Sequence, residues 1–213
     1  SSRGQVDPFI VMDMVAEAAA LEAAGRSIIH MEVGQPSTPA PRGAIAALSA
    51  RMETEALGYT VSLGIPELRA GIAALYQRWY GVTLNPERVI VTAGSSGAFL
   101  LAFTALFDAG DRVALGEPGY PSYRQILKAL SLQPVGIATR AENRLQPVPA
   151  DLAGVEMQGL IVASPGNPSG TMLSKDALAD LIGYAHQRGI SFVSDEIYHG
   201  LHYGERAHSA LEI

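Results

Sequence analysis

Short apolar runs alternate with longer helical patterns along most of this chain, and this alternation constrains the fold more than any other feature. The apolar runs are four or five residues long and lie at 88–92, 112–115, 134–137, 159–163 and 190–194. The helical patterns lie at 66–80, 98–107, 123–130 and 175–188. Such alternation is typical of a parallel sheet that is buried on both faces. The sequence therefore predicts an α/β fold, a three-layer α/β/α arrangement with a mostly parallel sheet.

The N-terminal part of the chain has a different pattern. Residues 11–24 are rich in helix formers and are followed by Gly25, whereas residues 28–33 alternate as a short strand would. Three prolines within 34–41 then indicate a break, and another helical pattern follows at 43–50. We therefore predict an N-terminal segment at 1–42 and a large domain at 43–213.

The composition excludes several classes of partner and site. The 213 residues carry a formal net charge of -6 with no long run of like charge, so there is no basic surface for nucleic acid or for a membrane. The absence of cysteine rules out disulfides and thiolate nucleophiles. No apolar stretch approaches the roughly 18 residues of a membrane span, and the first residues lack the layout of a signal peptide. We expect a cytoplasmic protein that binds small molecules or other proteins.

Small and polar residues follow the apolar runs, where a parallel sheet places its ligands. The loop Gly94-Ser95-Ser96-Gly97 would offer backbone N–H groups and two hydroxyls at a helix N-terminus, which suits a phosphate. The same residues could also serve only as a cap that starts the helix. A nucleophile elbow is disfavoured, because Ala98 stands where Gly-x-Ser-x-Gly needs its last glycine.

The loop SPGNPSG, residues 164–170, follows the run at 159–163 without a spacer. Pro165 and Pro168 restrict the backbone on either side of Asn167. We expect this rigidity to hold the amide in place before a ligand arrives, which lowers the ordering cost of binding.

The acids after the last run allow two rival interpretations. A Walker B strand end would need Gly-x-x-x-x-Gly-Lys-Ser/Thr upstream, but neither lysine of the chain, Lys128 or Lys175, lies in that motif. The spacings Glu-x-x-His and His-x-x-His within 196–202 could present metal ligands on a helix. Gly200 and the preceding strand disfavour a regular helix, so we expect no metal and favour a surface or supporting role for His199 and His202.

Taken together and in order, these motifs resemble the class I and II aminotransferases, the pyridoxal-phosphate enzymes of fold type I. The resemblance covers nearly the whole chain. Its most specific part combines the Asn-Pro-Ser-Gly turn with the Asp-Glu-x-Tyr strand end, which lie 28 residues apart from Asn167 to Asp195. The matching segments are Gly58-Tyr59, Gly64 to Arg69, Thr92 to Ser96, Pro118-Gly119-Tyr120, Ser164 to Gly170 and Ser194 to Tyr198.

The resemblance implies roles for residues around the ring of pyridoxal 5'-phosphate. Asp195 would pair with the protonated pyridine nitrogen and keep the ring cationic. Asn167 and Tyr198 would hydrogen-bond the 3-oxygen of the ring, and Tyr120 would stack on its face. The Asn167-Pro168 peptide bond is implied to be cis.

The resemblance also implies contacts outside the ring. Ser95, Ser96 and Gly97 would hold the cofactor phosphate, whereas Tyr59 would reach the cofactor phosphate of the other subunit in a homodimer with shared active sites. Gly34 would let the substrate carboxylate approach the backbone.

One element of the family pattern does not fall within this chain. The lysine that binds the cofactor covalently is expected well beyond the 18 residues that follow Asp195, and neither Lys128 nor Lys175 matches its position. The resemblance therefore implies the front half of such an enzyme. Residues 1–42 would form an N-terminal arm and small-domain segment, residues 43–213 an incomplete cofactor-binding domain, and the 213 residues alone would be inactive.

The resemblance implies an aminotransferase that moves an amino group between an amino acid and a 2-oxo acid. Two alternatives stay open. Carbon–sulfur β-lyases and aminocyclopropane-carboxylate synthases share the same residues in this half. A non-catalytic, aminotransferase-like ligand-sensing module is the other alternative, although no basic helix-turn-helix precedes Asp7 in this sequence.

Overall fold

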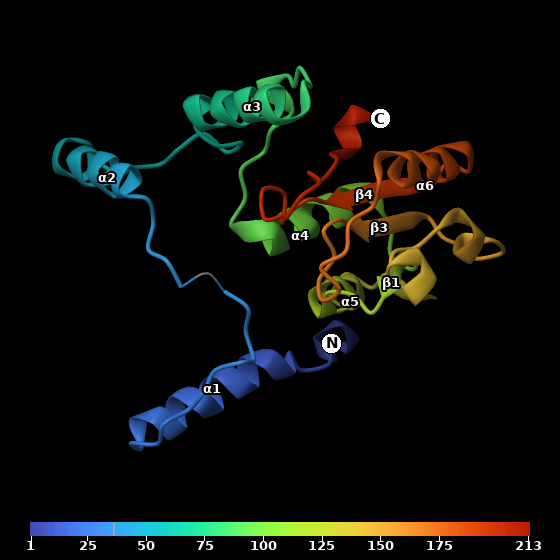
Figure 1. Ribbon diagram of the computed structural model, residues 1–213, viewed down its shortest axis with the longest axis horizontal. Helices are drawn as coiled ribbons and strands as arrows, with labels where there is room; N and C mark the ends of the chain where they lie inside the picture. The colour runs from blue at the N-terminus through green and yellow to red at the C-terminus, as the bar shows by residue number, and fades with distance from the viewer. Residues whose placement is uncertain (36) are drawn as a thin grey trace. The chain divides into compact units, whose positions relative to one another are not determined.

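A four-stranded parallel sheet forms the centre of the fold in the computed structural model, which describes residues 1–35 and 37–213 (Figure 1). The strand order is β2-β1-β3-β4, and every neighbouring pair is parallel. Each strand corresponds to a predicted apolar run. The strands are β1 Arg112–Glu117, β2 Gln133–Ala138, β3 Gly159–Ala163 and β4 Ser191–Asp195.

Helices cover both faces of this sheet, which confirms the predicted three-layer α/β/α class. Alternate residues of β1 divide between the faces: Val113 and Leu115 pack with α4 and α5, whereas Ala114 packs with α6. Phe103 and Leu181 are fully buried at the centres of the two layers. The helices of this part of the chain are α3 Pro66–Tyr80, α4 Gly94–Leu106, α5 Pro121–Ala129 and α6 Lys175–Gln187.

The predicted helix boundaries follow local capping chemistry. Helix α3 begins at a proline and ends at Gly81, whose φ of 70° lies in the left-handed region that favours glycine. Helix α6 begins after Ser174, whose side chain accepts a hydrogen bond from the backbone N–H of Ala177 at 3.2 Å. Short 3₁₀ turns lie at Ser2–Gly4, Pro86–Arg88, Ala141–Asn143, Pro149–Leu152 and Ala210–Glu212.

The chain divides into two units, Ser1–Asp7 with Leu63–Ile213, and Pro8–Ser62. The second unit contains the helices α1 Ile10–Ala23 and α2 Arg42–Thr54, both close to their predicted ranges. The division at 42/43 expected from the resemblance stays a prediction. No helix within residues 1–35 and 37–213 is long and apolar enough to cross a membrane.

Two predicted strands are wrong. Residues 28–33 form no strand, and Ile29 and Met31 are 87% and 89% exposed. In the run at 88–92, Arg88 is the last residue of a 3₁₀ turn, and residues 89–92 pair with none of the strands that the structure describes. The backbone N–H of Val91 donates one hydrogen bond to the carbonyl oxygen of Leu63 at 3.0 Å. A strand forms only where a neighbouring strand offers backbone hydrogen-bond partners, and the local sequence pattern does not show whether such a neighbour is present.

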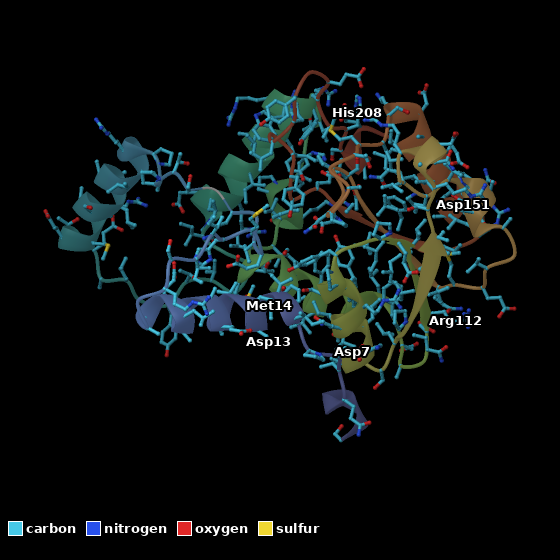
Figure 2. The ribbon with its side chains drawn as sticks, turned by 60° about the horizontal axis from the view of Figure 1, so that its bottom comes forward. Asp7, Asp13, Met14, Arg112, Asp151 and His208 are labelled. Atoms are coloured by element: carbon cyan, nitrogen blue, oxygen red, sulfur yellow. The ribbon has the colours of Figure 1, made fainter. Side chains whose placement is uncertain are left out.

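Polar contacts connect the periphery of the larger unit to its sheet and helices, and two residues that form them, Asp7 and Arg112, are labelled in Figure 2. The Arg112 guanidinium, at the start of β1, donates to the carbonyl oxygen of Glu156 at 2.8 Å. Asp7 accepts a hydrogen bond from Lys128 on α5 at 2.6 Å, and this lysine lowers the pKa of the Asp7 carboxyl. The first residues of the chain are thereby held against α5.

The carboxylate of Glu212 accepts hydrogen bonds from other residues of the last segment of the chain. Arg206 donates to both of its oxygens, at 2.6 and 2.9 Å, and the Ser209 N–H donates at 2.9 Å. The hydrogen bonds from Arg206 lower the pKa of Glu212 from 4.5 to about 2. Because the pKa is lower in the folded state, this stabilisation is present above pH 4.5 and is lost as the pH falls towards 2.

We expect the substitution Arg206→Gln to make the free energy of unfolding less dependent on pH between 4.5 and about 2. At neutral pH the loss should stay below about 1 kcal/mol, because the arginine is partly exposed. Urea titrations at a series of pH values measure both effects. An unchanged pH dependence in this window would contradict the assignment of the shift to Arg206.

Candidate functional site

Residues that follow three of the strands meet at one edge of the sheet. Asp195 ends β4, Asn167 lies in the turn after β3, and Tyr120 lies between β1 and α5. Tyr120 and Asn167 line one cavity together with Gly119, Tyr123 and Ala163. Two of the side chains expected around a flat ring, Tyr120 and Asn167, therefore line the same cavity, and Asp195 is hydrogen-bonded to Tyr123, which also lines it.

Asp195 is a buried carboxylate, only 9% exposed, with a hydrogen-bond donor at each oxygen. The Tyr123 hydroxyl, from α5, donates to Oδ2 at 2.5 Å, and the backbone N–H of Ile197 donates to Oδ1 at 3.0 Å. Burial, followed by the negative charge of Asp195, raises the pKa of Tyr123. Tyr123 therefore stays protonated and acts as the donor, and the carboxylate is held in one orientation.

We expect Tyr123→Phe to destabilise the protein by about 1.5–3 kcal/mol, because a buried charged acceptor loses its donor. The ring and its packing are retained, so the change reports on the hydroxyl. Urea unfolding measures the loss. Tyr203→Phe is the matched control, because Tyr203 is fully exposed at 100% and should change stability by no more than about 0.5 kcal/mol. Equal effects of the two substitutions would contradict this role of the Tyr123 hydroxyl.

Asn167 is connected to Tyr198, the residue with which the resemblance groups it. The Asn167 amide donates to the Tyr198 hydroxyl at 3.3 Å. The peptide bonds before Pro165 and Pro168 are both cis, as expected for the second of them. The amide and the hydroxyl thus form a polar pair beside the cavity.

A buried glutamine holds the turn that carries Asn167. Gln146 is 4% exposed, and its amide nitrogen donates to the carbonyl oxygens of Ala163 at 3.1 Å and Thr171 at 2.9 Å. The Ser169 and Thr171 hydroxyls lie 3.0 Å apart and form a hydrogen bond within the turn. The start and the end of the turn are therefore attached to the same side chain.

Ser95, Ser96 and Gly97 lie in the first turn of α4, which begins four residues earlier than the predicted helix at 98–107. This helix begins after Ala93 with no side-chain cap, so its first N–H groups have no partner within the helix. Within residues 1–35 and 37–213, neither serine hydroxyl forms a hydrogen bond. One turn further along, the ring of Phe99 packs edge-on against Tyr123, with centroids 5.1 Å apart. Phe99 on α4 thus contacts Tyr123, and Tyr123 in turn donates a hydrogen bond to Asp195.

Two predicted residues lie in the other unit, Pro8–Ser62. Gly34 is in an irregular segment, and Tyr59 is fully exposed at 108%. The contacts that bring Asp195 and Asn167 together do not include them, so their roles at the substrate and at a second subunit stay predictions.

Neither lysine of the chain is at the cavity. Lys128 is bonded to Asp7, and Lys175 is exposed at the start of α6. Among the residues that the structure describes, no group of three His, Asp or Glu side chains could hold a metal ion.

Sequence reasoning missed Tyr123 and Gln146, which support the site, whereas it favoured a surface or supporting role for His199 and His202. Tyr123 lies three residues after Tyr120, about one helical turn along α5. This spacing places the two side chains on the same face and could have identified Tyr123 as a neighbour of the site. No local pattern identifies Gln146, because its acceptors lie 17 and 25 residues away in the sequence.

The donor set fits one chemical type of ligand. A buried carboxylate suits a protonated ring nitrogen, an aromatic side chain suits the ring face, and an amide–hydroxyl pair suits a ring oxygen. The N–H groups of the first turn of α4, with Ser95 and Ser96, suit a phosphate. These residue types therefore fit a cationic aromatic ring that carries a phosphate.

Comparison with known proteins gives one consistent result. Residues 26–212 match the family described as Aminotransferase class I and II. The chain is 46% identical over 203 residues to valine–pyruvate aminotransferase of Mycobacterium tuberculosis, covering 94% of this chain and 52% of that protein. It is 32% identical over 206 residues to (5-formylfuran-3-yl)methyl phosphate transaminase of Methanocaldococcus jannaschii, covering 97% and 53%.

A solved structure supports the same grouping. The crystal structure of an aminotransferase from Mycobacterium tuberculosis has a TM-score of 0.93 and 44% sequence identity, and the match covers 98% of this chain and 55% of that one. The chain thus spans about half the length of these relatives.

Proposed function

Because this chain belongs to the aminotransferase class I and II family, we propose that the protein uses pyridoxal phosphate to move an amino group between an amino acid and a 2-oxo acid. The observation that carries the proposal is the buried Asp195 carboxylate, oriented by the Ile197 N–H and by the hydroxyl of Tyr123, which lines the cavity. Among the residues that the structure describes, no cationic side chain forms an ion pair with Asp195, and such a buried carboxylate suits a cationic ring.

The residues of this chain would hold the cofactor at four places. Asp195 would keep the ring nitrogen protonated, and Asn167 with Tyr198 would hydrogen-bond the 3-oxygen. Tyr120 would cover one ring face. The start of α4, at Ser95, Ser96 and Gly97, would bind the phosphate. When bound, the cofactor supplies an electron sink for the bond that breaks at the substrate α-carbon.

The remaining roles concern the whole protein. We propose that a lysine other than Lys128 and Lys175 binds the cofactor and moves the proton, so the 213 residues alone are inactive. The protein would act as a homodimer in which Tyr59 reaches the cofactor phosphate of the other subunit, and Gly34 would lie beside the substrate carboxylate. A cytoplasmic location agrees with the absence of cysteine, which requires no oxidising compartment.

Valine and pyruvate are the first substrates to test, because a relative at 46% identity is a valine–pyruvate aminotransferase. A full-length protein containing this sequence should bind pyridoxal phosphate and convert pyruvate to alanine with an amino-acid donor. Release of ammonia and a 2-oxo acid without an acceptor would instead indicate lyase chemistry. Cofactor binding with no turnover of any amino acid in a complete panel would indicate a sensing module.

The same preparation tests the position of the lysine. Borohydride reduction of the loaded protein, followed by peptide mapping, should find the cofactor attached outside the two lysine peptides of this chain. Recovery of the cofactor on Lys128 or Lys175 would contradict the site assignment.

A further inference from the structure

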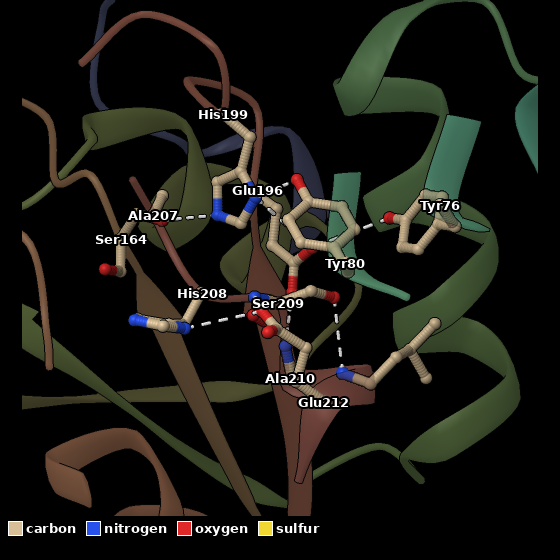
Figure 3. A network of polar contacts seen from close by, with 12 residues as sticks. Tyr76, Tyr80, Ser164, Glu196, His199, Ala207, His208, Ser209, Ala210 and Glu212 are labelled. Atoms are coloured by element: carbon tan, nitrogen blue, oxygen red, sulfur yellow. Dashed lines mark hydrogen bonds and ion pairs between the residues drawn. The ribbon is translucent and has the colours of Figure 1, made fainter. Parts of the chain in front are cut away.

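His199 is a nearly buried histidine that the proposed function does not use. Its side chain is only 5% exposed, and it follows Tyr198 directly in the chain. The Nε2 atom lies 2.9 Å from the carbonyl oxygen of Ser164, and the Nδ1 atom lies 2.6 Å from the hydroxyl of Tyr80 on α3 (Figure 3). The ring therefore connects the 164–170 turn, the segment after β4 and helix α3.

The partners of the ring determine its tautomer. A carbonyl oxygen only accepts, so Nε2 of His199 carries the hydrogen and donates to Ser164. In the neutral ring Nδ1 is then the acceptor, and the Tyr80 hydroxyl donates to it. Burial, together with the negative charge of Glu196, raises the pKa of Tyr80 to about 12, so the hydroxyl is protonated at neutral pH.

Ser164 is the residue at which the turn leaves the sheet. Its N–H donates to the carbonyl oxygen of Asp195 at 3.2 Å, which extends the ladder between β3 and β4 by one bond. Beyond this bond the two chain segments separate. The hydrogen bond from His199 to the Ser164 carbonyl joins the two segments a second time. Ser164 is thus bonded to Asp195 through its N–H and to His199, the neighbour of Tyr198, through its carbonyl oxygen.

The segment that carries His199 is itself held in place. Glu196 accepts hydrogen bonds at Oε1 from the Ser194 and Ser209 hydroxyls and from the Ala210 N–H, at 3.0, 3.1 and 2.7 Å (Figure 3). The Tyr76 hydroxyl donates to its Oε2 at 3.5 Å. The bond from His199 therefore attaches the carbonyl of Ser164 to an anchored segment of the chain.

We propose that His199 is a positioning residue that holds the start of the 164–170 turn and so sets the separation between the Asn167 amide and the Tyr198 hydroxyl. The consequence for the cofactor rests on the proposed function, because these two groups would meet the 3-oxygen of the ring. The restraint on the turn itself does not depend on any ligand.

Three variants of the full-length protein and one control test this role. His199→Leu removes both hydrogen bonds, whereas His199→Gln offers an amide that donates to Ser164 and an oxygen that accepts from Tyr80. Tyr80→Phe removes only the donor to Nδ1. His186→Leu is the control, because His186 is exposed near the end of α6.

The first measurement is amide hydrogen exchange of the turn in protein freed of cofactor. The useful probes are the N–H groups of Gly166 and Gly170, which donate to carbonyl oxygens within the turn. His199→Leu should exchange roughly 10-fold faster there, and His199→Gln and His186→Leu within about 2-fold of the parent protein. Unchanged exchange in His199→Leu would overturn the proposal. If His199→Leu does not fold, Tyr80→Phe tests the proposal instead. We then expect roughly 3-fold faster exchange of the Gly166 and Gly170 amides, and unchanged exchange would overturn the proposal.

The second measurement concerns the ligand. His199→Leu should bind pyridoxal phosphate roughly 10-fold more weakly and shift the pH dependence of its absorption spectrum, and His199→Gln should restore both. Failure of the parent protein to bind pyridoxal phosphate would overturn the proposed function, whereas the exchange result would still decide the role of His199. Equal affinity and equal spectra in the parent and His199→Leu proteins would show that the turn does not position ligand groups.

Discussion

Replacing Asp195 by asparagine is expected to lower kcat of the full-length protein by roughly 10²- to 10⁴-fold. The substitution keeps the size of the side chain and can retain a hydrogen bond with Tyr123, but it removes the negative charge. A charge partner lost from a buried pair costs about 3–5 kcal/mol, and each 1.4 kcal/mol corresponds to about a factor of ten in rate. Steady-state assays with a saturating amino donor measure the change.

The control for this prediction is Asp180→Asn on the exposed side of α6. It makes the same chemical change away from the cavity and should leave kcat within about 2-fold. Equilibrium dialysis with pyridoxal phosphate separates weaker cofactor binding from slower turnover. A value of kcat for Asp195→Asn that matches the parent protein at saturating cofactor would remove Asp195 from the proposed role.

Replacing Phe103 by alanine is expected to lower the free energy of unfolding by about 3–5 kcal/mol. Phe103 is fully buried, with its ring centroid 5.4 Å from that of Phe99 and 6.1 Å from that of Phe107. The substitution leaves a cavity between α4 and the sheet that the surrounding side chains fill only partly. Because small proteins are stable by only about 5–15 kcal/mol, this loss is a large share of the total.

Urea unfolding followed by circular dichroism measures the loss, and an unchanged denaturant slope would show that the same surface unfolds. Leu101→Ala on the same helix is the control in the same chain, because Leu101 is 59% exposed. It should cost less than about 1 kcal/mol. Equal losses for the two variants would mean that α4 does not pack as described.

The core and the site are connected through one side chain. Tyr123 belongs to the same buried cluster as Phe99 and Phe103, and its hydroxyl donates to Asp195. A loss of packing at α4 should therefore also loosen the Asp195 carboxylate. Through Tyr123, a buried helix face thus supports the site together with residues outside the helices, such as Gln146.

Much of the fold was predictable because its signals are local. The four paired strands and the helices α3 to α6 follow from short apolar runs, a proline start, a serine cap and a glycine stop. The same pattern predicted strands at 28–33 and 88–92 that do not form. An apolar run shows what can be buried, but not whether a neighbouring strand is present to pair with it.

The candidate site followed from the same kind of local signal. Asp195, Asn167 and Tyr120 were predicted as site residues because ligands bind beyond the carboxyl ends of parallel strands, and each lies at or just after such an end. Their roles stay predictions. Their hydrogen-bond partners could not be located, since Tyr123 is 72 residues from Asp195 and Gln146 is 17 residues from Ala163. Nothing in the local sequence connects such pairs.

The sequence by itself determined the order of elements, the strands that carry functional loops, and the rigid turn around Asn167, because apolar periodicity, capping and proline restriction act within a few residues. Only the tertiary structure decided which apolar runs became strands and which side chains hold Asp195 and Ser164. Those outcomes depend on hydrogen bonds between segments far apart in the chain, and Tyr123 and His199 acquire their partners only after the helices have packed on the sheet.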